Sequence, residues 1–387
     1  IRDRSEAEQF FELGGSAMEK FWADRLLGRE SMHVYGSAAK ALIQGRTILV
    51  TGAGGSIGSE IVRQMNTLEA GKVFCVDNDE FALYNLQMDL EGMALLDDDV
   101  YRLADIRDEQ LMRRIMQEVR PDVVFHAAAH KHLPLLERAP EAAVKTNVFG
   151  TQSVVRAAMA AGVDRIVNIS TDKAANPTSA LGWSKRLAEH VAGKYAETSA
   201  TKVASVRFGN VLGSRGSFLP TLMTQIQTGQ TIRITDPGVA RYFMTIPEAA
   251  GLVIEAACLA SGGETYVLDM GAPVRIESLL RRYVELVNCP MPEVEYTGLR
   301  PGEKMSEELF DLRETHYATP HPRISKVDVG AYPIDGALAL LRELVDHGAH
   351  PALVREALEF TTAGKVNDGL DSLSSGALST APSGSLN

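Results

Sequence analysis

The chain has 387 residues, of which 45% are hydrophobic and 23% charged, values that are typical of a globular protein and exclude a disordered or fibrous one. Its formal net charge of −11 disfavours a general nucleic-acid binder, because an acidic surface repels phosphate backbones. No apolar run reaches the ~18 residues of a membrane span. The three cysteines form neither a disulfide framework nor a zinc-binding pattern, so we expect no metal site and a reducing, cytoplasmic environment.

Short apolar strands and helical patterns alternate along the first half of the chain. Residues 1–44 are charged and helix-prone, and they predict a helical N-terminal lead-in. The strands expected after it are Thr47–Thr51, Lys72–Val76, Val100–Leu103, Asp122–His126, Arg165–Ser170 and Val203–Phe208. This alternation predicts an α/β fold with a Rossmann-type, doubly wound parallel sheet over residues 45–208.

Glycine and proline become frequent after residue 209, and the regular alternation of strand and helix is lost. We therefore expect a smaller C-terminal substrate-binding lobe over residues 209–365, interleaved with the end of the sheet. Residues 366–387 are rich in Ser, Gly and Ala without periodicity, which predicts a disordered tail.

A glycine cluster follows the first strand and opens a helix, in the stretch TGAGGSIG that ends at Gly58. Gly52 suits the tight turn, Gly55 lets the backbone approach a pyrophosphate, and Gly58 lets the helix pack closely on the sheet. The helix N-terminus at Ser56 and Ile57 would direct its free N–H groups at the phosphates. A glycine-rich turn without a ligand has the same composition, so the loop alone is a weak indication of dinucleotide binding.

Two acidic positions strengthen that interpretation. Asp77 ends the second strand, where a carboxylate can accept hydrogen bonds from both ribose hydroxyls and would repel a 2′-phosphate. This favours NAD over NADP. Asp105 and Ile106 follow the third strand, where folds of this kind usually hold the adenine.

Small and polar residues follow the fourth strand. Ala127 and Ala128 would let the backbone run flat beside the nicotinamide ribose. Lys131 and Asn147 lie just beyond them and are candidate cofactor contacts, and Lys131 is a candidate substrate contact as well. His126 fits a packed histidine better than a catalytic one, and the amide of Asn147 could equally be structural.

The fifth strand leads into Thr171, Asp172 and Lys173, and a helix carrying Leu181 and Lys185 follows. In short-chain dehydrogenases a tyrosine four residues before such a lysine removes the hydroxyl proton, while the lysine binds the ribose. Leu181 occupies the tyrosine position here and cannot transfer a proton. The site is therefore either inactive or has moved its proton chemistry to other residues.

Asp172 and Lys173 supply the groups for that chemistry. Asp172 can act as the acid and Lys173 as the base, provided that Lys173 is neutral. We expect the positive nicotinamide of NAD⁺ and the ammonium of Lys185 to lower the pKa of Lys173. The alternative is a surface ion pair, which the position at the carboxyl end of a central strand disfavours, because ligands bind there in open α/β sheets.

Five stretches carry a resemblance to a known family: ILVTGAGGSIGSE, HAAAHKHLPLLERAPEAAVKTNVFGT, STDKAANPTSALGWSKRLAEH, VRFGNVLGSRGSFLP and LRPGEKMSEELF. Over about residues 25–330 the chain resembles the UDP-N-acetylglucosamine 4,6-dehydratases of bacterial polysaccharide biosynthesis, which belong to the extended short-chain dehydrogenase/reductase class. It is most similar to their large, membrane-anchored branch, in which transmembrane helices precede a cytoplasmic catalytic part. The resemblance implies the cytoplasmic part of an inner-membrane protein, with an anchor upstream of Ile1, and a homo-oligomer.

The resemblance also implies the reaction of an NAD-dependent lyase. UDP-N-acetylglucosamine would become a UDP-4-keto-6-deoxy sugar for polysaccharide or lipopolysaccharide (O-antigen) synthesis. Thr171 would hydrogen-bond the oxygen on sugar carbon 4, Lys173 would remove the proton on carbon 5, and Asp172 would protonate the hydroxyl leaving carbon 6. That branch commonly has methionine at the position of Leu181. Trp183, bulkier than the residue expected at its position, would narrow the sugar pocket.

A substrate clamp in the second lobe is implied in the same way. Asn210 and Arg215 would bind the diphosphate, while Arg241, Arg300 and Glu303 would hold the nucleotide. Each arginine taken alone could instead form a surface salt bridge.

Two other functions stay open at the level of the sequence. A nucleotide-sugar 4-epimerase or reductase usually needs the missing tyrosine. An epimerised product would lack the mass decrease of one water that dehydration causes. A nucleotide-binding protein without turnover would bind the cofactor tightly and form no product.

Overall fold

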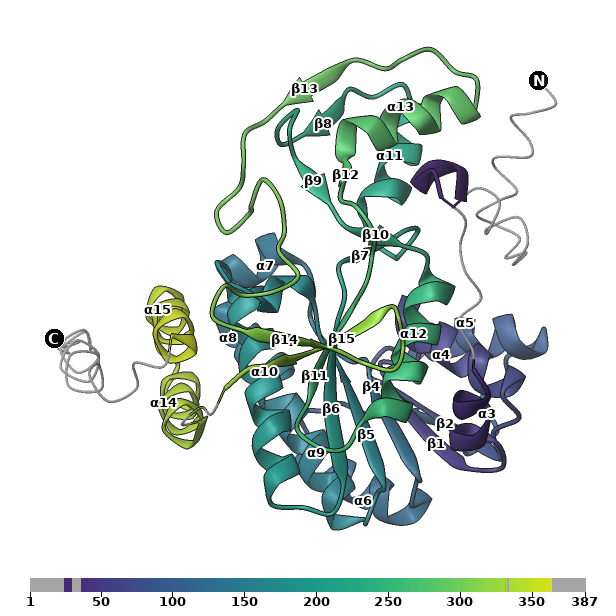
Figure 1. The fold of residues 1–387 in the computed structure, drawn as a ribbon, viewed down its shortest axis with the longest axis vertical. Helices are drawn as coiled ribbons and strands as arrows, with labels where there is room; N and C mark the ends of the chain where they lie inside the picture. The colour runs from purple at the N-terminus through teal and green to yellow at the C-terminus, as the bar shows by residue number, and fades with distance from the viewer. Residues whose placement is uncertain (1–23, 30–35, 331, 333, 364–387) are drawn as a thin grey trace, which may run out of the picture.

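A central sheet of nine strands organises the part of the chain that this computed structural model describes, residues 24–29, 36–330, 332 and 334–363 (Figure 1). The strands lie in the order β14-β15-β11-β6-β5-β4-β1-β2-β3. Their bounds are β1 Thr47–Thr51, β2 Lys72–Asp77, β3 Tyr101–Leu103, β4 Val123–His126, β5 Arg165–Ile169, β6 Lys202–Arg207, β11 Thr265–Leu268, β14 Thr315–Ala318 and β15 Ile324–Asp328.

The first six strands confirm the predicted Rossmann-type sheet. They are all parallel and lie in the order 3-2-1-4-5-6, which is the order of a dinucleotide-binding fold. Their ends differ from the predicted ones by at most one residue. The pairing of Thr51 with Val76 and with His126 brings the carboxyl ends of β1, β2 and β4 to one edge of the sheet.

Helices cover both faces of this sheet, which explains why its strands are apolar on both sides. Ile48 and Val50 of β1 pack in one core with α3, α4 and α12, while Leu49 between them packs in another with α6 and α9. The helices of this part are α3 Ser37–Ile43, α4 Ser56–Thr67, α5 Glu80–Glu91, α6 Glu109–Val119, α7 Leu133–Arg138, α8 Pro140–Ala143, α9 Thr151–Ala160, α10 Ala180–Glu197 and α12 Ile246–Leu259, with a π-helix at Val144–Gly150 and a 3₁₀ turn at Asp172–Ala174.

Residues beyond 209 form a separate small core and also return to the sheet. The small core, at the top of Figure 1, is built around Leu222, Ile232 and Leu279. Its elements are β7 Asn210–Val211, α11 Phe218–Gln227, β8 Ile232–Ile234, β9 Ala240–Arg241, β10 Phe243–Met244, β12 Val274–Arg275, α13 Ile276–Leu286 and β13 Val294–Tyr296. Strands β11, β14 and β15 extend the main sheet, so the second half of the chain completes the first.

Leu26 and Leu27 of the predicted lead-in pack in the core of the small lobe, while α3 and the C-terminal helices pack on opposite faces of the sheet. Within the predicted lead-in, α3 is helical and lies against α12, and the backbone N–H of Gly36 donates to Glu255 at 2.5 Å. Helices α14 (Ile334–Asp346) and α15 (Pro351–Thr362) share a core with α10. The other residues of the lead-in, 1–23 and 30–35, and the predicted tail 366–387 lie outside the described residues. Among the helices that are described, none is long and apolar enough to cross a membrane.

Candidate active site

A cavity of about 1020 Å³ lies at the carboxyl edge of the parallel strands, between the sheet and the small lobe. Its walls come from the loops after β1, β2, β3, β4 and β5 and from the lobe segments that begin at Gly209, Ile234 and Arg300. The volume reaches the upper end of the range for one drug-sized ligand, which leaves space for a dinucleotide beside a second molecule.

The glycine loop has the shape of a backbone cradle. Gly52 has φ of +66°, and a Cβ there would lie 2.6 Å from the backbone N of Ala128. A Cβ at Gly58 would lie 2.0 Å from the carbonyl oxygen of Gly52. These positions therefore exclude side chains, and the loop presents bare backbone to the cavity at the N-terminus of α4. Gly55, Ser56 and Ile57 line the same wall, so the residues present fit a bound pyrophosphate.

The two acidic positions lie in the same cavity. Asp77 ends β2 and accepts hydrogen bonds from the backbone N–H of Gly54 at 2.9 Å and of Asp79 at 3.0 Å. Asp105 lines the cavity together with Ile106. The side chain of Arg107 donates hydrogen bonds to the Asp105 carboxylate at 2.5–3.0 Å. This side-chain bond lowers the pKa of Asp105, and burial opposes it.

Some of the residues after β4 line the cavity, and one buried residue holds the loop in place. Ala127, Ala128 and Lys131 line the cavity. Asn147 does not: it is fully buried, and its amide bonds the backbone N and O of His130 at 2.9 and 3.1 Å and Ser184 Oγ at 3.1 Å. The expected cofactor contact of Asn147 finds no support in this structure, since its amide is committed to holding the loop at His130.

His126 is a packed histidine, as its sequence context indicated. Its ring nitrogens bond the hydroxyls of Thr51 at 2.7 Å and Thr151 at 3.0 Å. Burial, with a smaller effect of Lys185, lowers its pKa to about 3, so the ring is neutral near pH 7.

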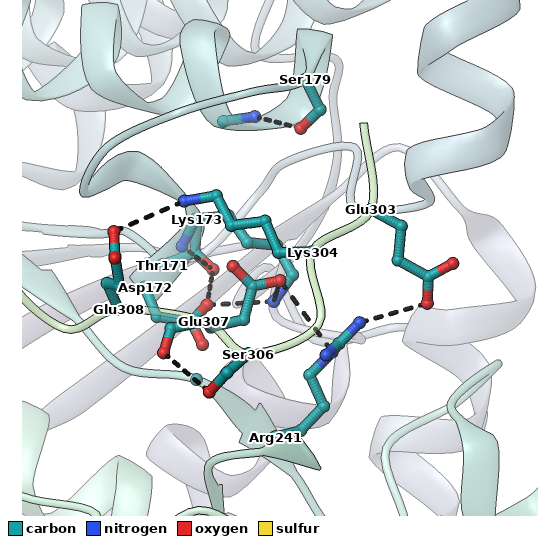
Figure 2. Close-up of polar contacts among 12 residues, drawn as sticks. Thr171, Asp172, Lys173, Ser179, Arg241, Glu303, Lys304, Ser306, Glu307 and Glu308 are labelled. Carbon is teal, nitrogen blue, oxygen red and sulfur yellow. Dashed lines mark hydrogen bonds and ion pairs between the residues drawn. The ribbon is translucent and has the colours of Figure 1, made fainter. Parts of the chain in front are cut away.

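Thr171, Asp172 and Lys173 lie together directly after β5, as Figure 2 shows. Asp172 is fully buried, and its Oδ1 accepts from Thr171 Oγ1 at 2.9 Å and from Lys173 Nζ at 3.0 Å. Its Oδ2 has no hydrogen-bond donor among the described residues. That oxygen lies behind Gly209, where a Cβ would approach it to 2.7 Å. Thr171, Lys173 and Gly209 line the cavity, whereas Asp172 lies behind them and does not.

In this structure the pKa of Lys173 is raised and Lys185 is not among the charges that act on it, while the expected effect of NAD⁺ stays a prediction. Burial alone lowers the pKa of Lys173, but the charges of Asp172 and Glu307 outweigh burial and raise it overall, with Arg241 opposing them. Lys173 is thus held as an ammonium by a largely buried pair, not by a surface ion pair.

Helix α10 presents Leu181 and Lys185 to the cavity, one turn apart. Lys185 is 5% exposed and its Nζ donates to the carbonyl of Ile169 at 2.5 Å. Burial lowers its pKa to about 8, against a smaller raising effect of Glu189. Leu181 occupies the space of the missing tyrosine.

Trp183 does not line the cavity and so does not narrow it, contrary to expectation. It lies outside the cavity lining, in the core of α10 with α14 and α15. Its indole N–H donates to the carbonyl of Pro177 at 3.2 Å, and Arg355 of α15 stacks over its ring at 4.9 Å. It stands two residues from Leu181, and side chains at that spacing point to different faces of a helix.

The predicted clamp residues all line the cavity, but their side chains differ in what they already bond. Arg241 is largely occupied: it donates to Glu303 at 3.1 Å and to the carbonyls of Ala240 and Met305. Glu303 also accepts from Thr235 and from the backbone of Arg300.

The remaining clamp residues are more open to a ligand. Arg300 is exposed, and no described residue bonds its guanidinium. Asn210 begins β7, and its backbone bonds the carbonyl of Tyr242. Arg215 is exposed as well, and its backbone N–H donates to Ser56 Oγ at 3.1 Å, which joins the lobe to the glycine loop.

A family model described as "Polysaccharide biosynthesis protein" matches residues 48–329. The chain belongs to this family. The polysaccharide biosynthesis family member from Bacillus subtilis (strain 168) named "Probable polysaccharide biosynthesis protein EpsC" is 43% identical over 317 residues, which are 81% of this chain and 53% of that protein. The chain thus spans about half the length of this relative. A UDP-glucose 4-epimerase from Rickettsia rickettsii is 29% identical over 81% of this chain and 94% of its own length.

Solved structures share the fold of this polysaccharide biosynthesis protein. Pen from Bacillus thuringiensis matches with a TM-score of 0.68 and 33% identity, over 75% of this chain and 89% of that one. DesIV, a dTDP-glucose 4,6-dehydratase from Streptomyces venezuelae solved with NAD and TYD bound, matches with a TM-score of 0.62 and 24% identity, over 68% and 88%. The likeness to DesIV shows the extended short-chain dehydrogenase fold.

Sequence reasoning missed Glu307 in this polysaccharide biosynthesis protein, although the residue lies in the stretch LRPGEKMSEELF. Its carboxylate is buried beside Lys173 and Arg241, at 3.9 Å from each side chain. Two glutamates stand side by side in that stretch, and the second, Glu308, faces solvent. The signal was present, but only the tertiary structure distinguishes the inward glutamate from the outward one.

A buried charge cluster behind the site was missed as well. Arg207 is fully buried and bonds Glu189 at 2.6 and 2.7 Å and Glu314 at 2.8 Å. Glu314 also pairs with Arg186, and Glu189 accepts from Ser170 Oγ at 2.6 Å. Ser170, which precedes Thr171, is thereby connected to α10 through Glu189, and through Arg207 and Glu314 to β6 and the segment before β14.

Proposed function

We propose that this chain is an NAD-dependent nucleotide-sugar 4,6-dehydratase, which converts UDP-N-acetylglucosamine into a UDP-4-keto-6-deoxy sugar for polysaccharide synthesis. One observation carries the proposal. Lys173, paired with Asp172, faces the same cavity as the glycine loop, while Leu181 stands in the tyrosine position. The site therefore has acid and base groups away from that position, which elimination of water needs and 4-epimerisation does not.

NAD would bind along the glycine loop, with Gly52, Gly55 and Gly58 at the pyrophosphate. Asp77 would accept from the adenosine ribose, and Asp105 with Ile106 would border the adenine. Ala127, Ala128 and Lys185 would border the nicotinamide ribose. When bound, NAD⁺ supplies the redox chemistry, taking hydrogen with its electron pair from carbon 4 and returning it at carbon 6.

The residues after β5 would handle the protons. Thr171 Oγ1 would hydrogen-bond the hydroxyl on carbon 4 and pass its proton to Asp172, to whose Oδ1 Thr171 already donates at 2.9 Å, as the hydrogen on carbon 4 leaves with its electron pair. Neutral Lys173 would take the proton from carbon 5, which the neighbouring ketone makes acidic, and the carbon–hydrogen electron pair would expel the hydroxyl on carbon 6. Asp172 would give the proton received from carbon 4 to that hydroxyl, which leaves as water, and Lys173 would return its proton to carbon 5 as carbon 6 is reduced. The unpartnered Oδ2 is the atom of Asp172 available to carry the proton, and because Asp172 does not line the cavity, this oxygen would have to reach the hydroxyl past Gly209.

The nucleotide diphosphate would lie against the lobe. Arg300 and Arg215 keep exposed side chains at the cavity, and Asn210 supplies an amide. Arg241, fixed by Glu303, would form the inner wall. Lys131 lines the same cavity, where burial and the charge of Arg215 lower its pKa, and it would bind the same phosphates.

The test is to incubate UDP-N-acetylglucosamine with the full chain and NAD⁺ in deuterated water, and to record mass and proton NMR spectra. Dehydration predicts the loss of one water, a new methyl signal and deuterium at carbon 5. A product of unchanged mass, apart from deuterium, would instead indicate epimerisation, the activity named for the Rickettsia relative. Unchanged UDP-N-acetylglucosamine, UDP-glucose, GDP-mannose and dTDP-glucose, with NAD clearly bound, would refute the dehydratase.

Lys173→Ala identifies the base. We expect this variant to keep NAD affinity and to lose deuterium entry at carbon 5. Lys326→Ala, which removes an exposed lysine of β15, is the matched control and should behave as wild type. Normal deuterium entry in Lys173→Ala would refute the assignment.

A further inference from the structure

The carboxylate of Glu307 lies behind the wall of the cavity, between two cations that line it. Its Oε1 is 3.9 Å from Lys173 Nζ and 3.9 Å from Arg241 Nε. Figure 2 draws both ion pairs as dashed lines. The side chain is 5% exposed and does not line the cavity. Glu307 therefore cannot touch a substrate in this arrangement, and it acts only through the residues in front of it.

The backbone fixes Glu307 to the strand that carries Arg241. The N–H of Ala240 donates to the carbonyl of Met305 at 2.9 Å, and Ser306 forms a parallel bridge with Ala240. Arg241 also donates to the carbonyl of Met305 at 3.2 Å. Because this segment is held by backbone hydrogen bonds, the Glu307 carboxylate has a nearly fixed position. The flexible side chain of Lys173 therefore moves to meet the carboxylate.

The charges around Lys173 come from three parts of the fold. Asp172 faces it from the same turn, Glu307 from the segment before β14, and Arg241 from β9. Glu307 itself also faces Lys304. Two carboxylates and one guanidinium leave a net charge of −1 around the amine, which favours its ammonium form. Without Glu307 the net charge of the groups around the Lys173 amine would be zero.

We propose that Glu307 is a positioning residue that holds the amine of Lys173 at the cavity wall and sets the pH above which that amine is free to accept a proton. The proposal rests on the proposed function, in which neutral Lys173 is the base. A lysine has a long and flexible side chain, and a second fixed anion beside Asp172 restricts where its amine lies. The cost is that the lysine stays protonated to a higher pH.

Glu307→Gln separates the charge from the shape, because the amide has nearly the size of the carboxylate. An opposite charge within about 4–6 Å shifts a pKa by about one to three pH units. We therefore expect the acidic limb of the kcat profile to move to lower pH by about one to three units, because Lys173 loses its proton more easily. The kcat of the plateau should fall, since the amine is less well placed. A merely structural role would lower kcat at every pH and leave the limb in place.

Glu308→Gln is the matched control. It makes the same charge change at the next residue, whose half-exposed carboxylate bonds Asn176 at 2.7 Å and approaches Lys304 at 3.8 Å. We expect no shift of the acidic limb in this variant. An equal shift in Glu308→Gln and Glu307→Gln would overturn the proposal, because it would show a general effect of net charge.

A second readout does not depend on turnover. Reductive methylation with formaldehyde labels neutral amines, and peptide mass spectrometry reports the labelled fraction at Lys173 against pH. In the full chain without substrate, Glu307→Gln should reach half-labelling of Lys173 at a pH lower by about one to three units than wild type. If no sugar nucleotide is dehydrated but this shift is found, the proposed reaction fails while the role of Glu307 stands. Dehydration with neither shift would refute the role of Glu307 alone.

Glu307→Asp keeps the test informative if the glutamine variant fails to fold, as judged by circular dichroism. Aspartate keeps the charge and withdraws it by one methylene from the amine. The labelling pH should then move in the same direction by a smaller amount. An unchanged labelling pH in a folded Glu307→Asp protein would overturn the proposal.

Discussion

The carboxylate of Glu314 gives a pH dependence of stability that follows from the structure. Burial alone raises the pKa of this carboxyl, but the hydrogen bonds and charges of Arg207 and Arg186 outweigh burial and lower it from 4.5 to about 2. Because the folded pKa lies below the unfolded one, the unfolded state binds more protons, and stability rises with pH. The stabilisation is present above pH 4.5 and is lost as the pH falls towards about 2.

The size of the effect follows from the two pKa values. At about 1.4 kcal/mol per pH unit, the difference corresponds to about 3 kcal/mol at neutral pH, of which about 2 kcal/mol is lost between pH 7 and pH 3. Glu314→Gln keeps the shape of the side chain and cannot ionise. Wild type should therefore exceed this variant in free energy of unfolding by about 3 kcal/mol at pH 7 and by about 1 kcal/mol at pH 3.

Urea titrations followed by circular dichroism at several pH values between 3 and 7 measure this difference. The control is Glu295→Gln, which removes an exposed carboxylate paired with Arg233 at 2.9 Å and should change stability by less than about 1 kcal/mol at every pH. A gap between wild type and Glu314→Gln that stays constant from pH 7 to pH 3 would refute the reasoning. It would mean that Glu314 titrates in the folded protein as it does in the unfolded chain.

Three further predictions concern the cavity. Asp77→Ala should weaken NAD much more than NADP in calorimetric titrations, because only NAD offers the ribose 2′-hydroxyl to this carboxylate; equal weakening would contradict the assignment. NAD affinity should fall by up to about tenfold from pH 7 to 9, as Lys185 loses its proton near pH 8, and Lys185→Arg should flatten the profile, since arginine stays charged. Gly209→Ala should lower kcat by at least about tenfold with NAD affinity unchanged, because its Cβ would meet Asp172 Oδ2 at 2.7 Å; unchanged kcat would argue against Asp172 as the acid.

The sheet was predictable because its signals are local. Among the six predicted strands, all but β3 are short, mostly apolar runs that end near a glycine or a polar residue, and Leu49 between Ile48 and Val50 shows why such a run has no alternation. The two-residue strands β7, β9, β10 and β12 were not predictable. Strands of that length have no periodicity, and they exist because the lobe folds back on itself.

The errors at the site have separate physical causes. The period of an α-helix, applied to Leu181 and Lys185, would already have turned Trp183 away from the cavity. No such rule was available for Asn147, whose amide bonds a backbone 17 residues away. The charge cluster joins Arg207 to Glu314 across 107 residues, and pairings at that separation depend on the whole topology.

The segment from Glu303 to Glu314 touches both halves of the molecule, and this limits how the enzyme can be recombined. Glu303 and Glu307 form ion pairs with Arg241 of the lobe. Glu307 also pairs with Lys173, and Glu314 pairs with Arg207, both beside the sheet. A chimera that exchanges residues 209–365 between relatives, in order to change the sugar accepted, would separate these partners. Crossover points that keep residues 170–207, Arg241 and residues 303–314 from one parent should preserve these pairs.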